Sequence, residues 1–181
     1  LERLLGRITK LNRKAHRAEL KNLRLLRAEA GYVLEYLLDR DSFEAVHVYF
    51  PDPWPKKRHQ KNRLIGELFP TIINPLLRKG GVIYLRTDNK EYFEQMLRVF
   101  DKAKGFASIE TPASMKKFTT DFERDFNSKG ILTRYAAYKK LNEFKFEQEA
   151  YERCANGKGN FKDNRKPYYK KASSHGGIQW L

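Results

Sequence analysis

The segment 50–59 brings a carboxylate, an aromatic ring and several cations together, in the order Phe-Pro-Asp-Pro-Trp-Pro-Lys-Lys-Arg-His. Three prolines at alternate positions predict a stiff, extended loop, because proline fixes φ and removes a backbone donor. Such a loop would fix the directions of the Asp52 carboxylate and the Trp54 ring. Cations then follow without an acid until Glu67, namely Lys56, Lys57, Arg58, Lys61 and Arg63. This combination suits a nucleobase held beside a phosphate backbone, although a helix-capping aspartate followed by solvated cations would give the same pattern.

Two further motifs carry acids at the expected ends of elements. Thr87-Asp88-Asn89 directly follows an apolar stretch, and Thr120-Asp121-Phe122-Glu123 follows a pair of lysines. Asp88 is also an ordinary N-cap for a helix over 89–102, and a threonine three residues before a glutamate is a capping box. Taken singly, each motif leaves a structural and a functional interpretation open.

The hydrophobic pattern alternates between helical and strand periods. It predicts helices over 1–20, 32–39 and 89–102, a broken helix over 62–78, and strands over 22–26, 45–50, 82–86 and 131–139. Helices that alternate with short apolar strands indicate an α/β fold, with a parallel sheet covered by helices on both faces. In such sheets ligands bind beyond the carboxyl ends of the strands, where the acidic motifs stand.

In this order and spacing the three motifs resemble the tRNA (guanine-N7)-methyltransferases, and so does the segment 22–30. The resemblance covers about residues 1–140. It implies a class I (Rossmann-like) methyltransferase fold, S-adenosylmethionine as cofactor and tRNA as partner. The implied reaction is methylation at N7 of the guanine at position 46, in the variable loop.

The resemblance also implies roles for individual residues. Glu29 matches an acidic position beside the adenine of the cofactor, where the family more often has Asp, and Asp52 matches the catalytic carboxylate where cofactor and substrate meet. The positions matching substrate contacts are Lys56, Asp88, Thr120, Asp121, Phe122 and Glu123. Because N7 loses no proton on methylation, carboxylates would stabilise the developing positive charge rather than act as bases. We therefore expect Asp52, Asp88 and Glu123 to converge around one purine.

Composition narrows the class of partner. The formal net charge of +15, from 37 Lys and Arg against 22 Asp and Glu, favours a polyanion. Cys154 is the only cysteine, which excludes a disulfide framework or a cysteine-based zinc site within one chain, and we expect no metal. No apolar run reaches eighteen residues and no signal peptide is recognisable, so a cytoplasmic, reducing setting without a membrane is expected.

The sequence predicts a partial methyltransferase domain over 1–141 and a basic C-terminal extension over 142–181, partly helical and then flexible. No strand, glycine-rich turn and helix precede residue 22, so the first strands of the resembled fold are expected to be missing. We accordingly expect this polypeptide alone to fold poorly or to fail to bind the cofactor. The alternatives are a non-catalytic RNA-binding remnant and a methyltransferase of small molecules, although a small substrate would not need so basic a surface. The sequence does not indicate the oligomeric state.

Overall fold

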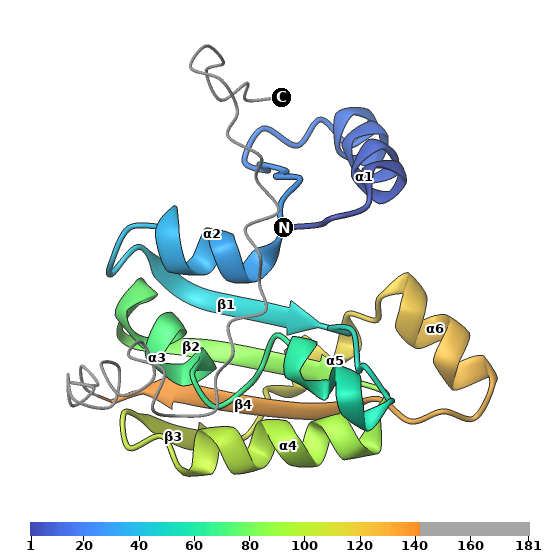
Figure 1. Ribbon diagram of the computed structural model, residues 1–181. Coiled ribbons are helices and arrows are strands. Elements are labelled where there is room, and N and C mark those ends of the chain that lie inside the picture. Colours follow the sequence, from blue (N-terminus) through green and yellow to red (C-terminus); the bar gives the residue numbers. More distant parts are fainter. Residues whose placement is uncertain (142–181) are drawn as a thin grey trace. The chain divides into compact units, whose positions relative to one another are not determined.

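The computed structural model describes residues 1–141 (Figure 1). Their contacts divide them into two compact units, a larger one with residues 1–3 and 28–141 and a smaller one with residues 4–27. The smaller unit contains helix α1 (Leu5–Arg17), which lies within the helix predicted over 1–20. The domain boundary predicted after residue 141 stays a prediction, because the extension 142–181 lies outside the described residues.

The larger unit is built on a four-stranded sheet in the order β1-β2-β4-β3 (Figure 1). The strands are β1 (Phe43–Tyr49), β2 (Leu77–Thr87), β3 (Phe106–Ile109) and β4 (Arg134–Lys140). β1 is parallel to β2, whereas β4 runs antiparallel to both β2 and β3. The prediction of an all-parallel sheet was therefore wrong, because β4 inserts in the reverse direction between two strands that point the same way.

Helices α2 (Ala30–Tyr36), α3 (Phe69–Ile73) and α4 (Lys90–Asp101) contribute to the core on one face of this sheet. In α4 the buried side chains recur at helical spacing, which turns one stripe of the helix to the strands. Alternate residues of the strands meet that stripe. Buried members of this core are Leu34, Phe69, Ile73, Ile83, Leu85, Met96, Phe100 and Tyr138.

The opposite face of the sheet carries the intervening residues of β1 and β2, among them His47, Tyr84 and Arg86. Helices α5 (Ala113–Lys117) and α6 (Asp121–Ser128) meet this face where β2 ends, through contacts of Arg86 with Met115 and Glu123. Further along the face, the rings of His47 and Tyr84 stack with centroids 4.9 Å apart. The predicted α/β architecture, with helices on both faces of the sheet, is confirmed.

Two predicted elements differ from the structure. Residues 22–26 form no strand, since no neighbouring strand pairs with their backbone within the described chain. The predicted broken helix over 62–78 is replaced by the 3₁₀ helix η1 (Lys57–Asn62), then α3, a second 3₁₀ turn η2 (Asn74–Leu76) and the start of β2. Leu77 pairs with Phe43 of β1, a contact distant in sequence that helical periodicity could not reveal.

Candidate functional site

The backbone of the proline-rich loop that follows β1 is strained. Phe50 and Trp54 both have positive φ, at 49° and 43°, a region that costs a bulky residue roughly 1–2 kcal/mol. The Phe50 N–H donates to the Arg86 carbonyl at 2.9 Å, so the loop begins directly beside the end of β2. Asp52 is exposed between the two strained residues. The Trp54 ring is partly buried and meets the His59 ring edge-on, with centroids 5.9 Å apart.

The cations after this loop do not all face solvent. Lys56, Lys57, Arg58 and Lys61 are exposed, whereas Arg63 is 6% exposed. Arg63 Nε donates to the Pro53 carbonyl at 2.7 Å, and its terminal nitrogens contact Gln95 and Glu91 of α4. The sequence interpretation of Arg63 as part of a solvent-facing basic segment was therefore wrong, because this guanidinium turns inward.

At the end of β2, Asn89 rather than Asp88 is the N-cap of α4. The Asn89 side chain accepts from the Tyr92 N–H at 2.8 Å, and the Thr87 hydroxyl accepts from the Asn89 N–H at 3.2 Å. The structural interpretation of Asp88 as the cap was wrong, and its carboxylate takes no part in the cap. Its carbonyl accepts from Arg134 at 2.8 Å, which ties this turn to the start of β4.

The predicted capping box at α6 is confirmed. The Thr120 hydroxyl accepts from the Glu123 N–H at 3.1 Å, and the Glu123 carboxylate accepts from the Thr120 N–H at 2.8 Å. That carboxylate is fully buried and also accepts from Arg86 at 2.9 Å and from the Tyr135 hydroxyl at 2.7 Å. In this structure Glu123 is enclosed by protein groups, whereas Asp121 and Phe122 on the same turn are exposed.

The environment of Glu123 favours its charged form. Burial alone would raise the pKa of its carboxyl group, but the Thr120 N–H, the Tyr135 hydroxyl and the Arg86 charge together lower this pKa below its ordinary value. Burial and the hydrogen bond to Glu123 raise the pKa of Tyr135 to about 12. Arg86 lies between two rings, 4.3 Å from the centroid of Tyr49 and 5.3 Å from that of Tyr135. The buried ion pair of Arg86 and Glu123 thus joins strand β2 to helix α6.

The loop after β1, the turn after β2 and α6 lie at one edge of the sheet. The Phe50 ring packs against Phe122 and Phe126 of α6, with centroids 6.0 and 5.6 Å apart. On the other side, burial raises the pKa of Tyr92 in the first turn of α4 to about 12, and the Asp52 charge adds to this rise. Asp52, Asp88 and Glu123 thus share this edge, but the Glu123 carboxylate points into the protein.

Glu29 has a different local role from Asp52. It is the N-cap of α2, and its carboxylate accepts from the Gly31 N–H at 3.0 Å and from the Tyr32 N–H at 2.7 Å. A contact to the adenine of a cofactor would therefore have to share this carboxylate with the helix cap. The helix predicted over 32–39 is α2, which begins at Ala30, so the prediction did not place Glu29 at its cap.

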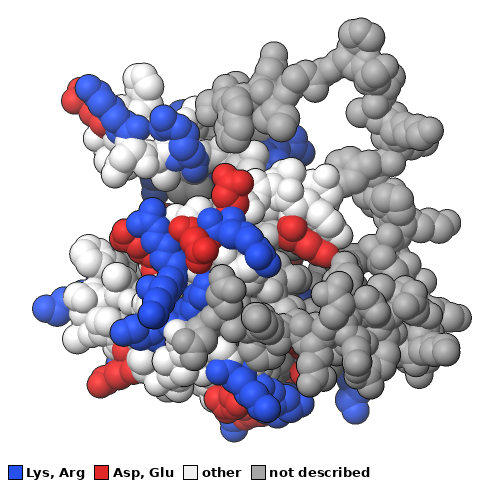
Figure 2. Space-filling model, turned by 90° about the vertical axis from the view of Figure 1, so that its left-hand side faces the viewer, with Lys and Arg blue, Asp and Glu red and all other residues white. Residues whose placement is uncertain are grey.

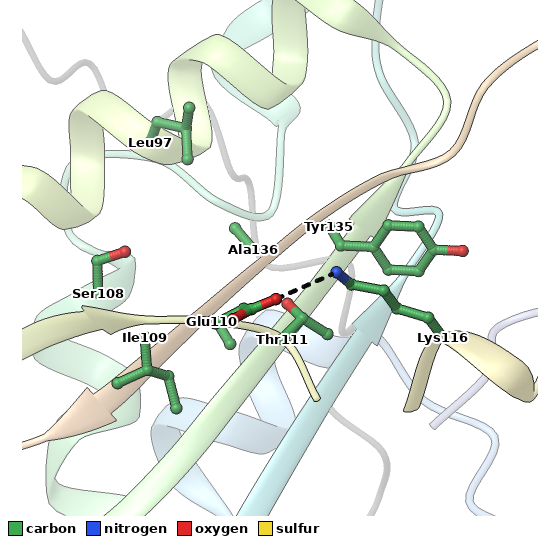
Figure 3. Close-up of a pocket in the computed structure, with 9 residues that line it drawn as sticks. Leu97, Ser108, Ile109, Glu110, Thr111, Lys116, Tyr135 and Ala136 are labelled. Atoms are coloured by element: carbon green, nitrogen blue, oxygen red, sulfur yellow. Dashed lines mark ion pairs between the residues drawn. The ribbon is translucent and has the colours of Figure 1, made fainter. Parts of the chain in front are cut away.

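A separate cavity in the described part of the chain lies away from these residues. It has a volume of about 310 Å³ beside the end of β3 (Figure 3), and an ion pair of 3.9 Å joins Lys116 and Glu110 in its wall. Both partners are substantially exposed, and such surface pairs contribute little to stability. The lining residues are Leu97, Ser108, Ile109, Glu110, Thr111, Lys116, Tyr135, Ala136 and Ala137. None of them is a residue that the sequence assigned to a site.

Charge on the side of the amino-terminal ends of β1 and β2 is mixed, since Figure 2 shows basic and acidic side chains next to one another there. Arg78 contacts Glu44 at 2.9 Å, and Lys102 contacts Glu67 at 3.7 Å. Within residues 1–141, no group of three His, Cys, Asp or Glu side chains is arranged to hold a metal ion. No described helix is long and apolar enough to cross a lipid bilayer.

Asp52, which is exposed, and Asp88, which is partly exposed, stand beyond the carboxyl ends of the parallel strands β1 and β2, where α/β sheets bind their ligands. A protein-family model described as "Putative methyltransferase" matches residues 1–135, and the chain belongs to this family. The chain is 39% identical over 128 residues to a "tRNA (guanine-N(7)-)-methyltransferase" of Neisseria meningitidis serogroup C (strain 053442), covering 70% of this chain and 51% of the relative. It is 37% identical over 112 residues to a protein of the same description from Mycobacterium sp. (strain KMS), covering 60% and 41%.

The chain spans about half the length of the curated relatives it matches. Among solved structures, it is similar to a putative methyltransferase from Thermoplasma acidophilum, with a TM-score of 0.45 and 16% identity, covering 78% of this chain and 56% of that one.

Proposed function

We propose that this protein takes part in transferring a methyl group from S-adenosylmethionine to N7 of a guanine in tRNA, at position 46 in the variable loop. The observation that carries the proposal is the exposed Asp52 on a strained loop, followed directly by exposed cations and flanked by Asp88. The names of relatives 37–39% identical to this chain support the same reaction. With this function we also propose that the protein is located in the cytoplasm.

The proposed roles follow from the chemistry of the acceptor. Guanine N7 has an in-plane lone pair and loses no proton, so the site needs a correctly oriented base and negative charge near the purine. Asp52 would stabilise the positive charge that spreads over the ring. Asp88, Thr120 and the exposed side chains of Asp121 and Phe122 would contact the nucleotide.

The exposed cations would hold the RNA backbone. Lys56 begins this surface and Lys57, Arg58 and Lys61 continue it along η1. Each lysine or arginine placed against a phosphate releases counterions, so binding should weaken steeply with salt. For Glu123 we propose an indirect role, since its carboxylate is engaged by Arg86, Tyr135 and Thr120.

S-adenosylmethionine would supply the methyl group, with Glu29 and Asp52 as the proposed contacts. The described residues do not by themselves fit around this cofactor. Neither residue lines the cavity beside β3, and the Glu29 carboxylate already accepts two backbone N–H groups. Calorimetric titration of the 181-residue chain tests the expectation that it does not bind S-adenosylmethionine alone, and micromolar affinity would contradict it.

The activity is tested with the protein expressed from its natural gene, assayed beside the 181-residue chain. Each is incubated with S-adenosylmethionine labelled in the methyl group and a tRNA transcript, and 7-methylguanosine is located by chemical cleavage at the modified base. A transcript with 7-deazaguanine at position 46 is the matched control, because it lacks the accepting nitrogen. Methylation at another base would reject the proposed position. Salt-sensitive tRNA binding with no transfer by either protein would favour the RNA-binding remnant.

The role of Asp52 is tested in the same assay. Asp52→Asn keeps the size of the side chain and removes its charge, so turnover should fall by roughly 10²-fold while tRNA affinity changes less than threefold. Equal turnover of variant and parent would remove Asp52 from the mechanism.

A further inference from the structure

Arg63 joins three parts of the larger unit. Its side chain is buried, and its guanidinium donates to the Pro53 carbonyl at 2.7 Å, to the Gln95 side chain at 2.6 Å and to Glu91 at 3.3 Å. The guanidinium carbon also lies 4.9 Å from the centroid of the Tyr92 ring. A buried arginine is tolerated only when its donors are paired in this way, because desolvation of the charge is costly.

The partners of Arg63 are fixed in their turn. The Tyr92 hydroxyl accepts from the Ile65 N–H at 2.9 Å, and the Gln95 amide donates to the Ile65 carbonyl at 2.9 Å. The first two turns of α4 thus hold the backbone just after Arg63. The same helix is capped by Asn89, the residue that follows Asp88. The N-terminal part of α4 is therefore connected to both segments that carry Asp52 and Asp88.

The loop with Asp52 has few backbone N–H groups with which a neighbouring strand could hold it. Residues 51, 53 and 55 are prolines, so only Asp52 and Trp54 keep an N–H that could join a backbone ladder. Phe50 and Trp54 have positive φ, a conformation that persists only where surrounding contacts enforce it. The carbonyl that Arg63 holds belongs to Pro53, between Asp52 and Trp54.

We propose that Arg63 is a positioning residue that fixes the Asp52 carboxylate relative to Asp88 by holding the Pro53 carbonyl against the first two turns of α4. The inference rests on the proposed function for the role that it gives Asp52. Residues close to Arg63 in the sequence, such as Lys61, are exposed and belong to the surface proposed to contact phosphates. The segment from Lys56 to Arg63 would thus both bind phosphates, through its exposed cations, and position the Asp52 loop, through Arg63. The number of charges alone cannot distinguish these two roles.

The loop itself provides the test, because Trp54 is one of only two tryptophans. The chain carries Trp180→Phe and is labelled with 5-fluorotryptophan, so that its ¹⁹F spectrum reports Trp54 alone. Arg63→Gln, Arg63→Lys and Gln95→Met weaken the proposed contact, and Lys61→Gln is the control that removes an exposed charge from the same segment. Circular dichroism monitors the fold of each variant. Should Arg63→Gln lose helical signal, Arg63→Lys carries the test, since it keeps the charge but loses the planar set of donors.

The inference predicts that the Trp54 signal of Arg63→Lys shifts or splits, with the helical signal retained, while Lys61→Gln keeps the parent spectrum. An unchanged Trp54 signal in both Arg63→Lys and Gln95→Met would overturn it. In the methyl-transfer assay, Arg63→Lys should lower kcat about tenfold and leave KM for tRNA within about twofold, whereas Lys61→Gln should mainly raise KM. If the parent protein does not methylate tRNA, the proposed function fails, and the ¹⁹F spectra still decide the role of Arg63.

Discussion

Replacing Glu123 by glutamine should destabilise the larger unit far more than an exposed change of the same kind. The Glu123 side chain is fully buried, and all three of its partners donate to it: Arg86, the Thr120 N–H and the Tyr135 hydroxyl. Glutamine has nearly the same shape. Its oxygen can still accept from Arg86 and Thr120, and Tyr135 can rotate its hydroxyl to accept from the new amide. The substitution therefore removes mainly the charge.

The expected loss follows from the Arg86 charge left without a counterion. The Arg86 side chain is 3% exposed, so water cannot replace the lost carboxylate. Breaking a buried pair from one side costs about 3–5 kcal/mol, and the retained hydrogen bonds place Glu123→Gln near 3 kcal/mol. For a chain of this length that corresponds to a fall in Tm of roughly 6–12 °C.

The pH dependence has a definite sign. The pKa of Glu123 is lowered below its ordinary value of 4.5, by hydrogen bonds from Thr120 and Tyr135 and by the Arg86 charge against the opposing effect of burial. A lowered carboxyl pKa gives stability that is complete above the unfolded value and is lost as pH falls through the folded value. The difference in unfolding free energy between parent and Glu123→Gln should be constant near neutral pH and shrink below about pH 4.5.

Urea unfolding at several pH values measures this difference. The matched control is Asp125→Asn on the same helix, whose carboxylate pairs with Lys129 at 2.8 Å with both side chains more than half exposed. That control should change stability by less than about 0.5 kcal/mol. The double variant Arg86→Met, Glu123→Gln should lose less than the sum of its single variants, because it leaves no buried unpaired charge. A Glu123→Gln loss no larger than that of Asp125→Asn would refute the reasoning.

Three further outcomes are expected. Burial first, and then the Arg86 charge, lower the pKa of His47 below 6.5. An NMR titration of His47 should therefore give a midpoint below 6.5, and this midpoint should rise in Arg86→Met. The stability linked to His47 is complete above about pH 6.5 and is lost as pH falls. Lys56→Gln should weaken tRNA binding and reduce the slope of log K against log salt by about one, measured by filter binding. Trp54→Gly should be more stable to urea than Trp54→Ala by about 1 kcal/mol, since both lose the ring and only glycine relieves the positive φ of 43°.

The regular elements that the sequence predicted well are those whose signals are local. The helix predicted over 89–102 is α4 within a residue at each end, because its apolar stripe and its Asn89 cap are both encoded within one segment. The capping box of Thr120 and Glu123 is equally local. The reversed direction of β4 depends instead on pairing with β2, about fifty residues away in the sequence, and no periodicity records it.

The candidate site was predictable in its location but not in the environment of each side chain. The motifs do stand at the ends of β1 and β2, as the rule for α/β sheets predicts. Spacing could not show that Arg63 turns inward, nor that the Glu123 carboxylate faces Arg86 rather than solvent. Both facts depend on side chains that the fold brings together from more than twenty-five residues away.

The buried cations also determine how the charge of this protein should be understood. Arg63, Arg86 and Lys140 are all nearly inaccessible, and each meets an acid: Glu91, Glu123 and Asp41 respectively. Each pair removes one positive and one negative charge from the balance, so the surplus of +15 is undiminished by their burial. The net charge therefore still favours a polyanionic partner. The surface that would bind this partner is smaller than the segment from Lys56 to Arg63 suggests, because Arg63 is buried. Around the Asp52 loop that surface consists of the exposed cations from Lys56 to Lys61, so replacing one of them should reduce the salt dependence of RNA binding.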